Sequence, residues 1–346
     1  MQSWPLERKI QVSQTRILEF GLKYPDKTYI SFSGGKDSTV LMDLVRRVFP
    51  DTPAVFIDTG LEYPEVRKFA LSQPDVVVVK PELTFRQVIK KYGYPLTTKR
   101  IAGYVNTAKR NPNSTRAQYL RGEKFSTLFG FGDGKFNFLT EAPFEISDYC
   151  CNVMKKQPAH RYTKKTGQHP ILGTMACESI HRRNEWKRSG CNIIDGHEPM
   201  CKPMSFWTEQ DVLLYILKYL QGPLDLLWKQ AGYAHGSVRK RARKELRRRN
   251  YSQYAYASVY GKIVQDENGR LHTTGCVRTG CVFCAFGCHL EGEPGRFQLL
   301  KKSHPKLYNY CMRPWDQGGL GLKDVFDWFN EHVPEGKKKT PHIYYE

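Results

Sequence analysis

A glycine turn between a strand and a helix constrains this chain more than any other feature. Residues 28–32 (TYISF) have the apolar character of a short buried strand, and residues 40–45 carry apolar side chains at helical spacing. The hexapeptide 33–38 (SGGKDS) joins them. Its glycines permit close backbone approach, and the N–H groups at the start of a helix form a cradle for an anion. We therefore predict that this turn binds phosphate.

The hexapeptide also supplies side chains suited to a phosphate group. Besides the two glycines, it offers hydroxyl donors and a positive charge, and its spacing differs from the Walker A pattern G-x-x-x-x-G-K-S/T. The alternative is a turn that merely needs glycines. We expect nucleotide-binding roles for Ser33, Gly34, Gly35 and Ser38, and catalytic roles for Lys36 and Asp37.

Apolar runs that alternate with helical patterns predict the fold class. We expect strands at 28–32, 54–57, 76–79 and 170–174, and we expect the strand at 76–79 to be buried. We expect helices at 6–22, from 64 onward, at 85–92, at 209–220 and at 322–329. Residues 103–137 are polar and basic, which predicts a loop or a helical excursion. The alternation favours an α/β fold with a doubly wound, mainly parallel sheet, whose ligand crevice lies at the strand ends.

The length of 346 residues suggests more than one domain. We expect a nucleotide-binding domain at 1–220, a basic insertion at 221–250 and a C-terminal cysteine-rich lobe at 251–346. The N-terminus has no apolar signal-peptide core, and no apolar stretch is long enough to span a membrane. We therefore expect a cytoplasmic protein whose ten cysteines serve metal or redox chemistry rather than a disulfide framework.

Positive charge dominates the composition. There are 54 Lys and Arg against 34 Asp and Glu, a formal charge of +20, which favours a polyanionic partner. Residues 237–250 are dense in Lys and Arg, and they could follow a phosphate backbone while neighbouring aromatics stack on bases. The alternatives are a solvated helix or loop, or an acidic protein partner. The aromatics in question are Trp228, Tyr233, Tyr251 and Tyr254.

Several motifs together resemble a known family. The hexapeptide matches the S-G-G-x-D-S motif of the PP-loop ATP pyrophosphatases, the adenine nucleotide alpha hydrolase-like superfamily. Residues 56–64 (FIDTGLEYP) resemble the second adenylate-binding motif of its sulfonucleotide reductases. Residues 173–183 resemble a G-x-x-x-x-E-S motif that is followed by arginine, and residues 202–212 resemble the P-x-x-x-W-x-x-x-D-V helix start. On these motifs the chain is identified as a member of the phosphoadenylyl-sulfate (PAPS) reductase family.

The resemblance implies further site residues. It implies ATP and Mg²⁺ as ligands, and it assigns the pyrophosphate leaving group to an arginine, Arg182 or Arg183. A surface Glu–Arg pair is the alternative for the third motif. The residues implied for nucleotide or Mg²⁺ are Asp58, Thr59, Gly60, Glu62, Gly173 and Glu178.

The cysteines fall into a tandem pair and a distant C-x-x-C. Cys150 and Cys151 with Cys281 and Cys284 resemble the four thiolates that hold a 4Fe–4S cluster in assimilatory adenylyl-sulfate reductases. Zinc is the alternative metal for four thiolates. Cys276 and Cys288 are alternates, since they could complete a local site with the C-x-x-C.

Two departures from the reductases shape the expected function. No cysteine follows Cys311, where the reductases carry their nucleophile, and the loop is unaltered as in superfamily members that use ATP itself. We expect ATP-dependent adenylation of an acceptor, with sulfur transfer and release of AMP and pyrophosphate. The expected acceptor is tRNA, DNA or an acidic carrier protein, served by a sulfur donor protein. The alternatives are a sulfonucleotide reductase that uses partner thiols, and a non-catalytic nucleic-acid-binding module.

Overall fold

The computed structural model describes residues 1–125, 133–223, 225, 236–237, 240, 255–335 and 340–346. These residues form two compact units, each built from separate stretches of chain. Unit 1 comprises Met1–Asp58, Glu62–Lys80 and Pro158–Gly280, and unit 2 comprises Thr59–Leu61, Pro81–Gln157 and Cys281–Glu346. This division differs from the boundaries expected at 220 and 250. Most of the basic segment 237–250, and its four expected aromatics, lie outside the described residues.

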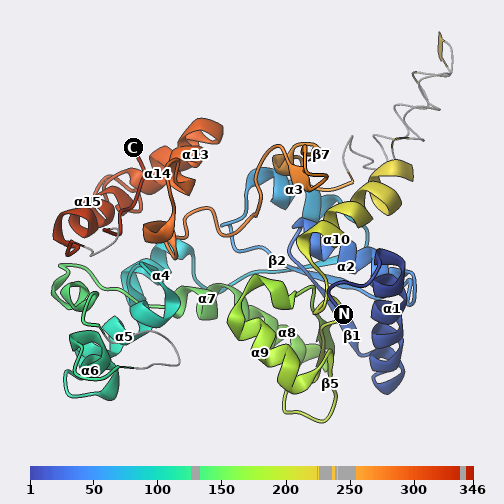
Figure 1. Cartoon of the computed structure of the whole chain (residues 1–346), viewed down its shortest axis with the longest axis horizontal. Coiled ribbons are helices and arrows are strands. Elements are labelled where there is room, and N and C mark those ends of the chain that lie inside the picture. Colours follow the sequence, from blue (N-terminus) through green and yellow to red (C-terminus); the bar gives the residue numbers. More distant parts are fainter. Residues whose placement is uncertain (126–132, 224, 226–235, 238–239, 241–254, 336–339) are drawn as a thin grey trace. The chain divides into compact units, whose positions relative to one another are not determined.

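Unit 1 is built on a six-stranded sheet with the order β3-β2-β1-β4-β6-β5. Every neighbouring pair is parallel except β5 with β6. The prediction of a mainly parallel α/β sheet is therefore confirmed (Figure 1). The strands are β1 (Thr28–Phe32), β2 (Ala54–Ile57), β3 (Val76–Val79), β4 (His169–Ile171), β5 (Asn192–Ile193) and β6 (Met200–Cys201).

Helices cover both faces of this sheet because successive side chains of a strand point in opposite directions. Ile30 of β1 lies in the core cluster that it shares with α1 (Leu6–Lys23) and α2 (Lys36–Arg46). The neighbouring Tyr29 faces the other way, toward α8 (Gln157–Thr166), where its hydroxyl lies 3.2 Å from Thr163 Oγ1. A strand buried on both faces explains why apolar side chains at 29, 30 and 32 do not alternate with polar ones.

The strand β3 differs from the sequence-based expectation. Val77 and Val78 are 39% and 42% exposed, so the prediction of a buried strand at 76–79 was wrong. Among the described residues of unit 1, β3 pairs only with β2 and lies at the end of the strand order. An edge position leaves apolar side chains partly in solvent, and a run of valines does not distinguish an edge strand from a central one.

The remaining elements of unit 1 frame the ends of the strands. Thr208 caps α10 through a capping box with Asp211, and Trp207 is fully buried, as the W-x-x-x-D-V motif predicts. These elements are α3 (Pro64–Ser72), η3 (Ala176–Glu178), α9 (Ile180–Ser189), α10 (Glu209–Tyr215), the π-helix η4 (Ile216–Gln221), η5 (Ser258–Tyr260), and the hairpin β7 (Ile263–Gln265) with β8 (Leu271–Thr273).

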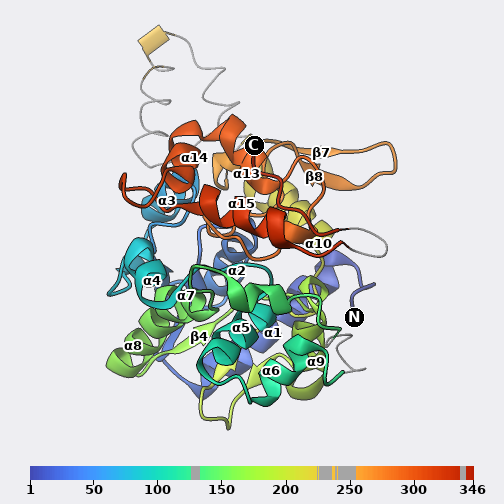
Figure 2. The same cartoon turned by 90° about the vertical axis from the view of Figure 1, so that its left-hand side faces the viewer.

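The named elements of unit 2, within its described residues, are all helices joined by loops. Much of the polar stretch 103–137 is a helical excursion, in which Thr98 and Ser114 cap the first two helices. Helices α13, α14 and α15 lie side by side near the C-terminus (Figures 1 and 2). The helices are α4 (Phe85–Tyr92), α5 (Lys99–Arg110), α6 (Thr115–Arg121), η1 (Asn137–Glu141), α7 (Tyr149–Cys151), η2 (Asn152–Lys156), η6 (Cys288–Leu290), α13 (Arg296–Ser303), α14 (Pro305–Met312) and α15 (Leu322–His332).

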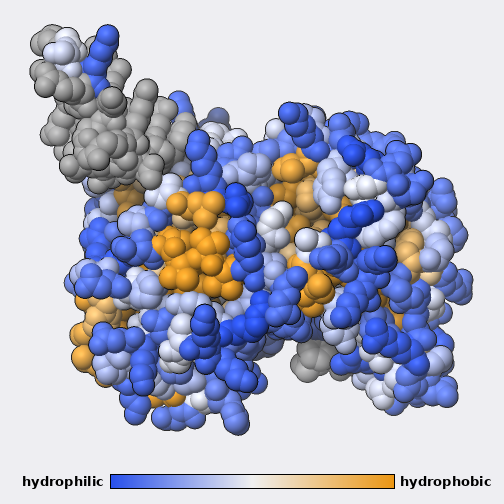
Figure 3. All heavy atoms as spheres, turned by 180° about the vertical axis from the view of Figure 1, so that it is seen from behind, coloured by the Kyte–Doolittle hydropathy of each residue, from blue (hydrophilic) through white to orange (hydrophobic). Residues whose placement is uncertain are grey.

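Apolar side chains form separate patches on a mostly hydrophilic face (Figure 3). Within the described residues, no helix has the length and apolar character needed to pass through a bilayer.

The glycine turn offers a direct test of close packing. Gly34 has a φ of +73°, and a Cβ there would lie 2.9 Å from the Val66 carbonyl oxygen; Gly60 has a φ of +72° but open space around it. Both alanine substitutions carry the left-handed backbone cost of about 1–2 kcal/mol. We expect Gly34→Ala to lower the urea unfolding midpoint more than Gly60→Ala. Equal midpoints would show that the turn does not pack closely on α3.

Candidate nucleotide site and cysteine pocket

The glycine turn is held closed by its own serines. Ser33 and Ser38 hydroxyl oxygens lie 3.0 Å apart, and Ser38 Oγ donates to the Gly35 carbonyl at 2.9 Å. The turn leads directly into α2, whose N-cap is Gly35. The first N–H groups of α2 and its positive dipole end therefore meet at this turn, as a phosphate site requires.

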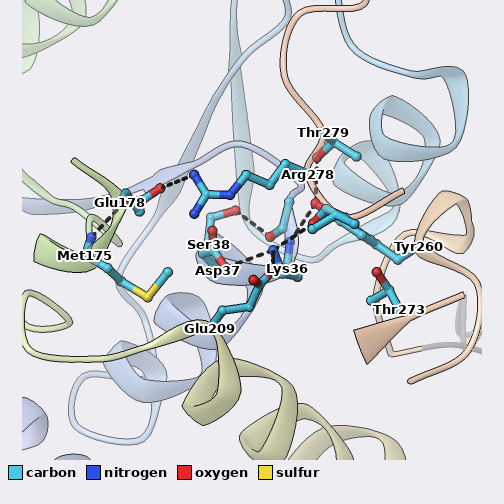
Figure 4. Close-up of polar contacts among 12 residues, drawn as sticks. Lys36, Asp37, Ser38, Met175, Glu178, Glu209, Tyr260, Thr273, Arg278 and Thr279 are labelled. Carbon is cyan, nitrogen blue, oxygen red and sulfur yellow. Dashed lines mark hydrogen bonds and ion pairs between the residues drawn. The ribbon is translucent and has the colours of Figure 1, made fainter. Parts of the chain in front are cut away.

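Lys36 is buried although it carries a charge. Its Nζ lies 3.1 Å from Glu209 Oε1 and 3.6 Å from Asp37 Oδ1, and it donates to the Val277 carbonyl at 3.1 Å. The ring of Tyr260 lies 5.6 Å away (Figure 4). A buried ammonium needs such partners, because removing it from water is costly. These contacts fix the ammonium at the start of α2.

Asp37 has one oxygen whose hydrogen-bonding capacity is unused. Oδ1 is buried and, within the described residues, accepts no hydrogen bond, although the side chain as a whole is 30% exposed. Burial raises the pKa of Asp37, while Lys36 and Arg278 act to lower it. The Lys36 ammonium lies 3.6 Å from this oxygen, which keeps the capacity to accept a hydrogen bond or to bind a cation. A carboxylate oxygen of this kind fits Mg²⁺.

Two guanidinium groups gather around one carboxylate beside the turn. Glu178 Oε2 forms an ion pair with Arg182 and accepts from the Met175 N–H at 2.9 Å, and Glu178 Oε1 lies 3.4 Å from Arg278 Nη1. Figure 4 shows the contacts of Glu178 with Met175 and Arg278. Burial and the nearby Arg278 lower the pKa of Arg182. Arg183 lies on the same helix but is exposed. The structure thus brings Arg182, and not Arg183, to the expected glutamate.

Gly173 also lies at the turn. A Cβ on it would lie 3.4 Å from the Asp37 carbonyl oxygen, so the residues after β4 contact the first turn of α2.

The residues of the second motif are divided between the two units. Asp58 is buried and accepts two 2.9 Å hydrogen bonds from Arg67, and Glu62 lies in the same unit, whereas Thr59 and Gly60 belong to unit 2.

Four residues around Lys36 were not assigned a role from the sequence. Tyr260 accepts a hydrogen bond from the Lys36 N–H at 3.2 Å, and its hydroxyl lies 2.6 Å from Thr279 Oγ1. Glu209 and Arg278 join the charge network described above. The matched segment 202–212 contains Glu209 only as part of a motif, and the motifs described above assigned no role to Tyr260, Arg278 or Thr279.

In unit 2, four cysteines line one pocket. Cys150 and Cys151 meet Cys281 and Cys284 there, together with Lys155. The Cys150 and Cys151 sulfurs lie 3.9 Å apart. A hydrogen bond from Cys150, helped by Lys99 and Lys155, lowers the pKa of Cys151, and the same hydrogen bond raises that of Cys150. Burial raises the pKa of Cys284 to about 11.

This donor set fits an iron–sulfur cluster. All four candidate ligands are thiols, which iron–sulfur clusters prefer, and two lysines can balance the negative charge. Among the residues that the structure describes, no group of three or more His, Cys, Asp or Glu side chains is placed to hold a metal ion.

The alternate cysteines lie elsewhere. Cys276 belongs to unit 1, where its thiol faces Tyr63 and Glu65. Cys288 is buried and donates to the Cys284 carbonyl at 3.6 Å, and it does not line the pocket. The tandem pair with the C-x-x-C is therefore the favoured ligand set.

A family model described as phosphoadenosine phosphosulfate reductase domain matches residues 27–130. Residues 27–130 are a domain of this family. The prediction of the PAPS reductase family is thereby confirmed. This PAPS reductase domain contains the glycine turn and the second motif, whereas Glu178, Arg182 and Tyr260 lie outside the matched range.

Two curated relatives show the extent of the similarity. The adenosine 5'-phosphosulfate reductase of Staphylococcus haemolyticus is 26% identical over 216 residues, which covers 59% of this chain and 66% of the relative. An uncharacterized protein of Methanocaldococcus jannaschii is 42% identical over 69 residues, 19% of this chain and 17% of the relative. The chain thus spans less than two thirds of the length of these relatives.

Solved structures are similar only at a coarse level. The PAPS reductase from Candida auris in its phosphate complex has a TM-score of 0.32 at 16% identity, covering 62% of this chain and 84% of that one. The U34-tRNA thiolase NcsA from Methanococcus maripaludis, with its 4Fe–4S cluster, has a TM-score of 0.30 at 16% identity. The match covers 71% of this chain and 75% of that one. The fold assignment therefore rests on the strand order of the sheet.

The raised pKa of Asp37 predicts a pH effect on stability. The folded protein holds this proton to higher pH than the unfolded chain, so the contribution of Asp37 to stability falls as pH rises from the unfolded pKa through the raised folded pKa. Asp37→Asn removes that fall. In thermal melts from about pH 4 upward, we expect the stability of the variant relative to the wild type to improve with pH until the pH passes the raised pKa of Asp37. The exposed Asp51→Asn is the control, and a relative stability that worsens with pH would contradict the assignment.

The cysteine pocket predicts which thiols retain iron. We expect Cys150→Ser, Cys151→Ser, Cys281→Ser and Cys284→Ser each to lower the iron and acid-labile sulfide of anaerobically purified protein. Cys288→Ser, a buried neighbour outside the pocket lining, should retain both. Iron loss in the Cys288 variant alone would reject the favoured set. Zinc in place of iron, by metal analysis, would reject the cluster.

Proposed function

We propose that this protein adenylates an acceptor with ATP and that a sulfur nucleophile then displaces AMP. The observation that carries the proposal is the unaltered glycine turn, with a fixed, buried Lys36 and an unsatisfied Asp37 oxygen at the start of α2. A cradle for several phosphate oxygens, a cation site and nearby arginines are what cleavage of ATP between its α and β phosphates needs.

Each group has a part in this step. The N–H groups at the α2 N-terminus and the ammonium of Lys36 bind phosphate oxygens. Asp37 would hold Mg²⁺, which supplies charge neutralisation for the phosphates when bound. Arg182 and Arg278, gathered by Glu178, would neutralise the charge that develops on the pyrophosphate leaving group.

The chemistry balances without an oxidant or reductant. A carbonyl oxygen of the acceptor attacks the α-phosphorus, the bond to the β-phosphate oxygen breaks, and pyrophosphate leaves. Sulfur at the oxidation level of hydrosulfide, brought by a donor protein, then attacks the activated carbon. AMP leaves with the former carbonyl oxygen, and one proton is released, which converts C=O into C=S.

The four pocket cysteines would hold a 4Fe–4S cluster in unit 2. When bound, the cluster would supply a sulfur-rich and redox-active centre. Lys99 and Lys155 act on the pocket thiols by favouring the thiolate of Cys151, the form that binds metal.

The favoured acceptor is a nucleic acid. The net charge of +20 supports a polyanionic partner, and an acidic carrier protein is the alternative with the same charge. A second candidate function, reduction of a sulfonucleotide with thiols from a partner, is supported by the similarity to the adenosine 5'-phosphosulfate reductase of Staphylococcus haemolyticus. It predicts consumption of adenylyl sulfate without ATP.

Pyrophosphate release tests the proposal directly. Anaerobically purified protein with ATP and Mg²⁺ should release AMP and pyrophosphate in equal amounts, faster with bulk tRNA or with DNA. Lys36→Ala removes a charge from the phosphates, so we expect a fall of about 10²-fold or more. Lys23→Ala, an exposed lysine of α1, is the control. Unchanged release by the Lys36 variant, or release of ADP and phosphate, would contradict the proposal.

A further inference from the structure

Helix α9 buries none of its ten residues, yet it stands beside the nucleotide site. Ser179 caps it, accepting from the Arg182 N–H at 3.2 Å, and Arg182 pairs with Glu178 of the preceding turn. A helix in a folded unit normally buries an apolar stripe. The lack of one here prompts the question of what the exposed surface of α9 contacts.

One side of α9 accounts for its attachment to unit 1. At 100° per residue, positions 182, 185, 186 and 189 fall on one arc, and these are the residues that are only partly exposed. Glu185 forms a 2.5 Å ion pair with Lys202, and Trp186 packs against the core cluster. The only acidic residue of the helix therefore faces inward.

The opposite side carries positive charge alone. We call it the outward face of α9; its members are Ile180, His181, Arg183, Asn184, Lys187 and Arg188, all exposed. Arg183 and Lys187 stand four residues apart, a like-charge pair that destabilises a helix by a few tenths of a kcal/mol. Ile180 is 74% exposed at the end nearest Glu178.

A helix that only needs to be soluble would be expected to mix charges. Solvated helices commonly place Glu or Asp four residues from Lys or Arg, because such pairs add stability. The outward face has three permanent cations, no acid and one exposed apolar side chain. Such a face suits a nucleic acid, because cations can contact its phosphates while an apolar side chain contacts a sugar or a base.

We propose that the outward face of α9 binds the sugar-phosphate backbone of a nucleic acid and thereby docks the acceptor at the adenylation site. The role of this binding, to dock an acceptor for adenylation, rests on the proposed function. The two arginines offer planar forks that match phosphate oxygens, and Ile180 offers an apolar contact to a sugar or base. Arg182, at the inner side of the same helix, links the docking face to the carboxylate that positions the leaving-group arginines.

The test compares two double variants that each remove two exposed charges from a helix of unit 1. Lys187→Gln with Arg188→Gln alters the outward face, and Lys164→Gln with Lys165→Gln alters the last turn of α8. Fluorescence anisotropy with labelled bulk tRNA and with a labelled DNA duplex gives the affinity at several salt concentrations. Losing two phosphate contacts should weaken binding about tenfold or more and make the log–log salt slope shallower by about 1.4–1.8.

We expect the α9 variant to lose affinity and the α8 variant to keep it, with thermal melts that match the wild type. The tRNA and duplex arms tell which nucleic acid supplies the phosphates. Equal losses in both variants, or an unchanged α9 variant, would overturn the proposal. So would the absence of binding by the wild type, or equally tight binding of poly-glutamate lost in the same variant, which would indicate an acidic protein.

Failure of this inference can be told from failure of the proposed function. Binding is measured without ATP, so specific loss in the α9 variant would support docking even if no pyrophosphate were released. Conversely, polymer-stimulated pyrophosphate release that is the same in wild type and α9 variant would retain adenylation and overturn docking on α9.

Discussion

Burial of the Lys36 ammonium is the interaction on which the rest of the nucleotide site depends. A buried cation is tolerated only when partners offset the loss of water, and Lys36 obtains them from α10, from the segment after β8 and from its own neighbour Asp37. Glu209 and Val277 are thereby brought to the start of α2 from distant parts of the chain. The same network leaves Asp37 Oδ1 without a hydrogen bond among the described residues, although the Lys36 ammonium lies 3.6 Å from it.

The sequence was sufficient to predict the local parts of this site. Two glycines between a strand and a helix admit few structures, so the turn, the parallel sheet and the capped helix at Thr208 were all predictable. The partners that come from distant parts of the chain could not be predicted. Tyr260, Arg278 and Thr279 lie in segments without periodicity, and their approach to Lys36 depends on packing that no spacing encodes. The edge position of β3 escaped prediction for the same reason, because neighbours decide burial.

Two charge patterns occur in unit 1. Around Glu178 and Lys36, cations and carboxylates lie next to each other in ion pairs, an arrangement consistent with the proposed phosphate chemistry. On the outward face of α9, cations stand without acids, which is the basis of the proposed polyanion contact. Arg182 and Arg183 show the difference most clearly, since adjacent residues of one motif face the site and the solvent respectively. In unit 2, the side chains that gather are thiols, those of Cys150, Cys151, Cys281 and Cys284 in one pocket.

Nucleotide choice tests the central claim most directly, because a site built for ATP must recognise phosphates that a sulfonucleotide lacks. Calorimetric titration of the anaerobic protein should be made with a non-hydrolysable α,β-methylene analogue of ATP plus Mg²⁺, and with adenylyl sulfate, for the wild type and for Lys36→Ala. The account predicts tighter binding of the ATP analogue by the wild type and loss of that preference in the variant. Tighter binding of adenylyl sulfate by the wild type, with no effect of Mg²⁺, would contradict it and would favour a sulfonucleotide reductase.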